Sequence, residues 1–168
     1  MQAEDAITML LKDHTLVKKF FVQAKTASKQ VAAKVSIFNQ IKAALEVHAA
    51  IEEEIFYPPV KQARSKHLKD EVREGYEEHK QIKSLLAQIA SITPADETYD
   101  MKIKVLMEDV EHHVKDEEGE MFPDAKKFLA ASRLVELGAA MAARKKQLEN
   151  HPTVAAPTRA PSSAPSAK

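Results

Sequence analysis

The fold is decided by a stretch that the chain contains twice. It reads HAAIEEEIFYP at residues 48–58 and HVKDEEGEMFP at residues 113–123, so the numbers of corresponding residues differ by 65. Each copy holds a His, a Glu four positions later and a Pro six positions after that Glu. Because residues four apart project from one side of an α-helix, each His–Glu pair is expected on a single helix face. The stretch therefore predicts two similar helices with the same polar pair.

The repeat extends upstream of both copies. Another His precedes each copy at the same spacing, so that His14 corresponds to His79 just as His48 corresponds to His113. The residues just before them, Asp13 and Glu78, correspond as well. An internal repeat of this kind indicates that the fold is built from similar units. The chain is therefore expected to consist of two related helix pairs.

Apolar residues recur at helical spacing through most of the chain. The pattern predicts helices over about residues 4–27, 30–57, 69–92, 94–122 and 132–149. Four long helices with short connections predict an all-α protein, an antiparallel up-down-up-down four-helix bundle with an extra C-terminal helix.

Prolines and one polar residue are expected to set the helix ends. Pro58 and Pro59 are expected to stop the second helix, and Pro123 the fourth. Thr93 is predicted to cap the fourth helix, with Pro94 at its first position.

The chain divides by composition into three parts. Residues 1–130 are expected to form the bundle and residues 131–150 the additional helix. Pro, Ala and Ser dominate residues 151–168, a composition that cannot build a core, and we expect a disordered tail there.

Charge and cysteine content exclude several classes of protein. Lys+Arg and Asp+Glu both number 25, so the chain lacks the basic excess of a nucleic-acid-binding protein. There is no cysteine, which excludes disulfides, thiolate nucleophiles and Cys-ligated metal sites.

No apolar run approaches the roughly 20 residues that span a membrane. The first residues lack the basic region of a signal peptide, so the expected location is the cytoplasm.

The helix pairs are expected to bring the repeated residues together. In a hairpin that turns near residues 28–29, His14 lies about 15 residues before the turn and His48 about 19 after it, at a similar level. The second pair repeats this geometry. A buried carboxylate is costly unless an opposite charge compensates it, and bound metal ions would supply that positive charge. The predicted metal ligands are His14, His48, Glu52, His79, His113 and Glu117.

The donor set suggests the metal. Four imidazoles and two carboxylates without thiolates suit iron or manganese, with zinc possible. Two histidines for each of two ions, with both glutamates bridging, would leave an exchangeable position. A small diatomic molecule or peroxide is the expected ligand.

These residues resemble the hemerythrin-like, or HHE cation-binding, family. The matching stretches are KDHT at residues 12–15, EHK at residues 78–80 and the two copies quoted above, and the resemblance covers about residues 4–130. It implies a four-helix bundle with a non-heme di-iron centre bridged by carboxylates and an oxo or hydroxo group.

The chain departs from the oxygen-carrying members of that family. Those members have an additional His one turn from the third-helix ligand, where this chain has Gly75 and Lys83. They also have an Asp five residues beyond the fourth-helix His, where this chain has Glu118. The symmetric pattern resembles bacterial members linked to NO or peroxide stress. Members that repair iron–sulfur clusters usually carry a separate Cys-containing N-terminal domain, and because this sequence contains no Cys, cluster repair is a weaker expectation.

Three functions follow from the resemblance. The first is a di-iron protein that binds, senses or detoxifies O₂, NO or peroxide. The second is a catalase-like enzyme that consumes peroxide. The third is metal storage, the weakest of the three, because the Glu-x-x-His pairs of ferritin-type sites are absent from the sequence. Either a monomer or a homodimer fits.

Other residues near the predicted ligands have plainer interpretations. His112 could pair with Asp116 in an alternative register, but the offset of the repeat selects His113. His67 and His151 are expected in a turn and in the tail, exposed to solvent. A solvated face is expected for Glu53, Glu54, Glu118 and Glu120.

Two aromatic residues and one glycine are also notable. Tyr57 and Phe122 correspond in the repeat and are expected to seal the end of the bundle, and Tyr57 or Tyr76 could be a redox neighbour of the metals. Gly75 corresponds to Leu10. The missing side chain predicts either space for a small ligand or close helix packing.

Overall fold

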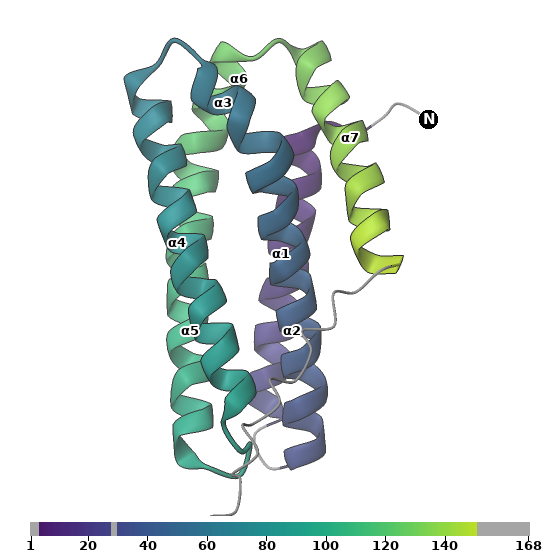
Figure 1. Ribbon diagram of the computed structural model, residues 1–168, viewed down its shortest axis with the longest axis vertical. Coiled ribbons are helices and arrows are strands. Elements are labelled where there is room, and N and C mark those ends of the chain that lie inside the picture. Colours follow the sequence, from purple (N-terminus) through teal and green to yellow (C-terminus); the bar gives the residue numbers. More distant parts are fainter. Residues whose placement is uncertain (1–3, 28–29, 151–168) are drawn as a thin grey trace, which may run out of the picture.

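The computed structural model describes residues 4–27 and 30–150, and within them all regular structure is helical (Figure 1). The segments are α1 Ala6–Thr26, α2 Val31–Ile51, η1 Glu52–Phe56, α3 Tyr57–Gln62, α4 Lys66–Ser91, α5 Glu97–Asp116, η2 Glu117–Met121, α6 Phe122–Phe128 and α7 Ala131–Asn150. The segments η1 and η2 are π-helical. The predicted tail, residues 151–168, lies outside the described residues.

Four long helices, α1, α2, α4 and α5, form an antiparallel bundle, which confirms the predicted fold class (Figure 1). The short helices α3 and α6 lie at one end of the bundle, and α7 packs along the α1–α2 side. No helix among the described residues has both the length and the apolar character needed to cross a membrane.

The apolar core consists of two clusters. One includes Leu10, Phe56, Val72 and Met141 and lies toward α3, α6 and α7. The other includes Phe21, Ile41, Leu86 and Leu106 and fills the opposite half. Along the bundle, the predicted metal ligands lie at or next to the change from one cluster to the other. Polar side chains at this level are therefore enclosed by apolar packing on both sides.

The structure corrects the predicted start of the fourth helix. Asp96, not Thr93, is the N-cap of α5, and its Oδ1 accepts a hydrogen bond from the backbone N–H of Thr98 at 2.8 Å. The carbonyl of Thr93 instead accepts from the N–H of Asp96, also at 2.8 Å, and closes a turn that contains Pro94. An Asp side chain satisfies a first-turn N–H as well as a Thr does, so the later residue can serve as the cap.

The prediction that prolines stop two helices was wrong. The chain remains helical through Pro58 and Pro59 to the end of α3, and through Pro123 to the end of α6. A π-helical turn precedes each proline, and the N–H of Tyr57 bonds to the carbonyl of Glu52, five residues back. This turn restarts the helix, so the prolines occupy its first positions, where no N–H is required.

Helix α7 agrees with the predicted segment at residues 132–149. It buries Leu134, Leu137 and Met141 against the α1–α2 side. Gly138 permits a very close approach, because a Cβ there would lie 2.1 Å from the backbone oxygen of Glu4. The helix thus covers one seam of the bundle tightly.

Candidate metal centre

The six residues predicted as ligands converge in one buried cluster at the middle of the bundle. Relative exposures are 2% for His14, His79, His113 and Glu117, 4% for His48 and 0% for Glu52. Ionisable groups are rarely buried this completely unless they are paired or hold a metal.

Local structure explains how the two glutamates reach this cluster. Glu52 is the first residue of η1 and Glu117 the first residue of η2. Each follows its His by four residues, so each pair lies on one helix face. Single π-turns inside α-helices often occur at functional sites. Here both π-turns begin at the carboxylate that corresponds by the repeat.

The carboxylates join the two helix pairs. Glu52 Oε2 lies 3.1 Å from His48 Nε2 and 3.2 Å from His79 Nε2. One of these histidines belongs to each pair, so Glu52 lies between the two halves of the bundle.

Glu117 has the equivalent position. Its Oε2 lies 3.2 Å from His14 Nε2 and 3.5 Å from His113 Nε2. The potential ligand atoms of the cluster form two groups, each with its atoms within 4.8 Å of one another, and Glu52 belongs to both. One group is His14, His48, Glu52 and Glu117, and the other is Glu52, His79 and His113. The geometry is that of two adjoining half-sites.

Several inward-facing atoms of the cluster have no hydrogen-bond partner. They are buried, and they include His14 Nε2, His48 Nε2, both oxygens of Glu52 and Glu117 Oε2. His79 and His113 bring their Nε2 atoms within 3.1 Å of each other. Buried polar atoms are nearly always satisfied in folded proteins. Converging lone pairs of imidazole and carboxylate satisfy a metal ion, so these residues fit the metal that was predicted from the sequence.

The charges within the cluster shift the pKa values of its members. Burial alone would lower the pKa of His48, but the charges of Glu52 and Asp13 raise it to about 10. Burial also opposes the charge on His79, whose pKa is raised to about 9 by Glu52 and Glu53. The pKa of Glu52 is held well below its usual value by His48 and His79, against the effect of burial.

A carboxylate lies behind each of the four imidazoles. Three accept a hydrogen bond from a histidine Nδ1: Glu118 from His14 at 2.9 Å, Glu53 from His79 at 2.9 Å and Glu78 from His113 at 2.8 Å. The fourth, Asp13, faces His48 Nδ1 at 3.9 Å, beyond hydrogen-bond distance. We call these four residues the outer carboxylates. A proton held on Nδ1 leaves the Nε2 lone pair for a metal.

This arrangement corrects the prediction of a solvated face for Glu53 and Glu118. The offset of the repeat relates Glu53 to Glu118, just as it relates Asp13 to Glu78. The repeat was therefore the signal that could have identified all four outer carboxylates. The other two residues of that prediction lie outside the cluster: Glu54 pairs with Arg144, and Glu120 lies near His67.

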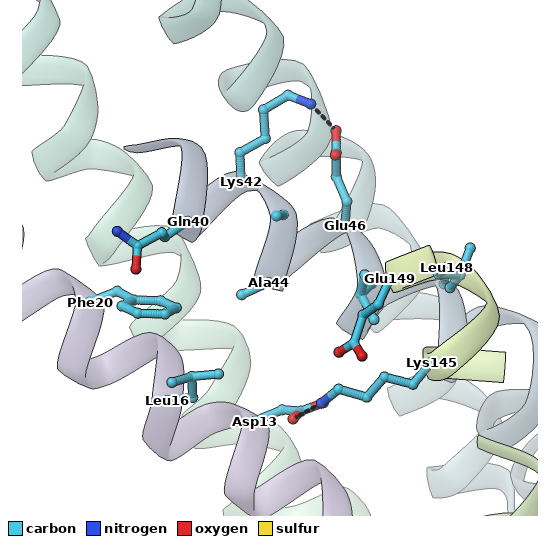
Figure 2. A pocket seen from close by; sticks show the side chains of 13 residues that line it. Asp13, Leu16, Phe20, Gln40, Lys42, Ala44, Glu46, Lys145, Leu148 and Glu149 are labelled. Atoms are coloured by element: carbon cyan, nitrogen blue, oxygen red, sulfur yellow. Dashed lines mark hydrogen bonds and ion pairs between the residues drawn. The ribbon is translucent and has the colours of Figure 1, made fainter. Parts of the chain in front are cut away.

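Helix α7 reaches the outer carboxylate on the α1–α2 side. Lys145 donates to Asp13 at the edge of a pocket of about 680 Å³ between α1, α2 and α7 (Figure 2). Phe20, Ala44 and Leu148 give this pocket mostly apolar walls. The C-terminal helix therefore contacts a residue that adjoins His48.

Two aromatic rings stack on the histidines from the α3–α6 end. Phe122 stacks on His14 with ring centroids 5.7 Å apart, and Tyr57 stacks on His79 at 5.5 Å. Tyr57 is not equivalent to Phe122 in one respect, since its hydroxyl donates a 2.8 Å hydrogen bond to Glu117.

Of the two alternatives predicted for Gly75, the structure shows close packing and not an open space for a ligand. A Cβ there would lie 2.6 Å from the Tyr57 hydroxyl oxygen. The phenol ring thus occupies the volume that a larger residue at position 75 would need. Tyr76 lies further out, and its hydroxyl donates to the backbone oxygen of Glu53 at 3.1 Å.

The other histidines lie away from the cluster. The side chain of His112 is 64% exposed, so the structure selects His113 as the inward residue, as the repeat predicted. His67 is exposed, as predicted, but it lies in the first turn of helix α4 and not in the turn between helices. His151 lies outside the described residues.

Comparison with known families gives a clear match. Residues 5–125 match the family described as Hemerythrin HHE cation binding domain. That range contains all six residues of the cluster and all four outer carboxylates.

Individual relatives are more distant. A DNA nickase of Nostoc sp. (strain PCC 7120 / SAG 25.82 / UTEX 2576) is 28% identical over 149 residues, which are 89% of this chain but 40% of the nickase. An uncharacterized protein of Mycobacterium tuberculosis (strain ATCC 25618 / H37Rv) is 26% identical, over 88% of this chain and 89% of that protein. The crystal structure of a hemerythrin HHE cation-binding domain-containing protein from Mycobacterium kansasii superposes with a TM-score of 0.74, at 22% identity and 88% coverage of both chains.

Proposed function

The chain belongs to the hemerythrin HHE cation-binding domain family, and from this premise we propose that it is a non-heme di-iron protein that binds, senses or detoxifies O₂, NO or peroxide. The proposed ligands are His14, His48, Glu52, His79, His113 and Glu117. Manganese or zinc would also fit these donors.

One observation carries the proposal. The inward-facing nitrogen and oxygen atoms of the cluster are buried and lack hydrogen-bond partners. Leaving several such atoms unsatisfied would cost roughly 1–3 kcal/mol each. Metal ions at the centre would satisfy all of them together.

The two groups of donor atoms support two ions. His14 and His48 belong to one group and His79 and His113 to the other, while Glu52 belongs to both. Glu52 therefore is the natural bridge, and Glu117 lies between His14 and His113. Two imidazoles for each ion and shared carboxylates would leave coordination positions for a small ligand.

The chain determines what can reach these ions. The cluster is almost fully enclosed, which favours a ligand with two non-hydrogen atoms over a larger substrate. When bound, iron supplies a change of oxidation state and an exchangeable coordination position for such a ligand.

Tyr57 adds a proton-bearing group beside the cluster. Burial and the charges of Glu117 and Glu52 raise the pKa of its phenol well above the usual value, so the hydroxyl keeps its proton at neutral pH. It therefore acts as a hydrogen-bond donor that fixes one carboxylate oxygen of Glu117.

The nicking of DNA is not extended to this chain. The chain spans 40% of the length of the nickase that it matches. Its 25 basic and 25 acidic residues give no excess positive charge for binding phosphates.

Metal analysis is the first test. The protein is loaded with Fe²⁺ under argon, desalted and analysed for iron, and we expect two ions per chain. Glu52→Ala should reduce this number because it removes the shared carboxylate. Glu54→Ala is the matched control, since its exposed side chain pairs with Arg144 outside the cluster. If the wild-type protein retains one iron ion or none per chain, the di-iron assignment is refuted.

Optical spectra then separate the ligands. The reduced protein is exposed in turn to O₂, NO and peroxide, and binding should produce a charge-transfer band. A band that is reversed by removing the gas supports binding or sensing. Rapid O₂ evolution from peroxide, lost in Glu52→Ala and retained in Glu54→Ala, supports an enzyme. Iron-loaded protein that responds to none of the three would exclude the oxidant function.

A further inference from the structure

The four seams between neighbouring bundle helices differ in the charge that covers the outer carboxylates. Three of these carboxylates pair with a lysine: Lys18 with Glu118 at 3.3 Å, Lys83 with Glu53 at 2.7 Å, and Lys145 with Asp13. An ammonium group at the mouth of a seam repels incoming cations. On the α1–α2, α2–α4 and α1–α5 sides, the way to the cluster therefore passes a positive charge.

The α4–α5 seam lacks this lysine. In the part of the chain that the structure describes, no lysine or arginine pairs with Glu78. Its Oε2 accepts from His113, while its Oε1 is buried and has no hydrogen-bond partner. His112 Nε2 lies 3.7 Å from this second oxygen and 3.4 Å from Asp116. These three side chains form a group of potential metal donors immediately outside the cluster.

A second group of donors lies at the outer end of the same seam. His67 Nε2 is 3.2 Å from Glu120 and 3.8 Å from Asp124, and His67 Nδ1 is 3.7 Å from Glu71. The donor atoms of His67, Glu71 and Glu120 all lie within 4.8 Å of one another. A mixed imidazole and carboxylate set of this kind suits a divalent transition-metal ion.

The two groups follow one line along the helices. Positions 112, 116, 120 and 124 are each four residues apart. A four-residue step along a helix advances by about 6 Å. Donors at such intervals could pass an ion from one set to the next, ending at Glu78 beside His113.

The internal repeat provides a comparison within the same chain. The positions that correspond to His112, Asp116 and Glu120 are Val47, Ile51 and Ile55, all apolar. Helix α7 covers the α1–α2 seam, on which these corresponding positions lie. Figure 1 shows α4 and α5 on the opposite side of the bundle from α7. A seam that no helix covers needs polar residues, but it does not need histidines combined with acids. The donor types therefore need another explanation.

An excess of negative charge in the outer group also favours the binding of a cation there. Burial raises the pKa of Glu71, and the negative charges of Glu120, Glu74 and Asp116 raise it further, against the effect of His67. Negative charge is thus in excess here. Lys127 compensates part of it through Asp124 Oδ1, at 2.7 Å.

We propose that the α4–α5 seam is the route by which divalent transition-metal ions reach the buried cluster. The outer group captures the ion, and the group at Glu78 passes it to His113. The route consists of His67, Glu71, Glu120 and Asp124 at the outer end, and Glu78, His112 and Asp116 at the inner end. This inference rests on the proposed metal centre, because it describes how that centre is loaded.

The rate of metal uptake tests the route. Co²⁺ is mixed with the metal-free protein in a stopped-flow instrument, and its d–d absorption reports binding at the histidines. The double variant H67A/E120Q should load about tenfold more slowly, because capture and electrostatic attraction are lost. His112→Ala should also load more slowly. The final absorption and the number of ions per chain should equal those of the wild type.

A matched control separates the route from net charge. Glu77→Gln removes one exposed negative charge from α4, where Glu77 pairs with Lys80 outside the seam, and it should load at the wild-type rate. Equal rates and full loading in wild type, H67A/E120Q and His112→Ala would overturn the route alone. Absence of metal from the buried histidines of the wild type would overturn both the route and the proposed centre. Equal slowing by Glu77→Gln would assign the effect to net charge and would also overturn the route.

Discussion

Tyr57 Oη donates a 2.8 Å hydrogen bond to Glu117 Oε1, and this bond joins α3 of one half of the repeat to η2 of the other half. It also breaks the near-symmetry of the repeat. Phe122 takes the equivalent place over His14 and has no hydroxyl to offer Glu52. The carboxylates of Glu52 and Glu117 therefore differ in their hydrogen bonding although their positions correspond in the repeat.

Tyr57→Phe tests the value of this bond. The ring should still pack, as Phe122 does, but Glu117 loses its donor, so unfolding of the metal-free protein should require about 1–3 kcal/mol less. Urea denaturation measures the difference. The control is Tyr76→Phe, whose partly buried hydroxyl bonds only a backbone oxygen and should contribute less. A larger loss in Tyr76→Phe would contradict the assigned role of Tyr57.

Gly75→Ala tests the packing against Tyr57. The new Cβ would lie 2.6 Å from Tyr57 Oη and 3.0 Å from Cζ, so the phenol must move and weaken its bond to Glu117. We expect a loss of about 1–3 kcal/mol in thermal or urea unfolding. Gly119→Ala is the matched control, because nothing lies within 4 Å of its added Cβ. That change should stabilise by roughly 0.5–1 kcal/mol, the usual advantage of Ala over Gly in a helix.

A double variant checks that both residues act through the same contact. If the phenol hydroxyl is what the added methyl group displaces, G75A/Y57F should cost less than the sum of the two single changes. Strict additivity would mean that Gly75 is required for a different reason.

The pH dependence of stability follows from two raised pKa values. In the folded metal-free protein the pKa of His48 is about 10 and that of His79 about 9, against an ordinary value of 6.5. Both histidines bind protons more tightly when folded, so their stabilising effect is complete below about pH 6.5. It declines as the pH rises and is lost through pH 9 to 10.

Thermal unfolding at several pH values measures this effect. The melting temperature of the metal-free protein should fall between pH 6.5 and 10. The metal-loaded protein should behave differently, because a metal needs neutral imidazoles and its binding releases protons. Metal uptake in weak buffer with a pH indicator should therefore acidify the solution. Uptake without proton release would show that the histidines are neutral before the metal binds.

The sequence predicted the position of the cluster but not its surroundings. The offset that relates residue 48 to residue 113 identified the six convergent residues without any knowledge of helix contacts. The sequence predicts a solvated face for Glu53 and Glu118, and an ideal α-helix would indeed rotate them away from Glu52 and Glu117. Their actual partners lie on neighbouring helices, far away in the sequence. Such lateral contacts depend on how helices pack, which periodicity does not encode.

The same limit explains the other differences. Proline usually stops a helix, and sequence alone did not reveal the π-turns that allow Pro58 and Pro123 to continue one. The fit between Tyr57 and Gly75 joins two different helices, α3 and α4. The repeat identified Gly75 as the residue that corresponds to Leu10, but it did not identify Tyr57 as the residue that fills the space beside it.

Glu53→Gln tests the outer carboxylates against an adjacent control. Glu53 accepts from His79 Nδ1 at 2.9 Å and holds that imidazole with Nε2 toward the cluster. An amide removes the negative charge that makes the imidazole a better ligand, so metal affinity should fall by roughly 10–100-fold. Competition with a chromophoric chelator measures the affinity. Glu54→Gln changes the neighbouring residue identically, but its partner is Arg144 on α7, so its affinity should remain that of the wild type. Equal losses in the two variants would mean that surface charge, not the bond to His79, controls metal binding.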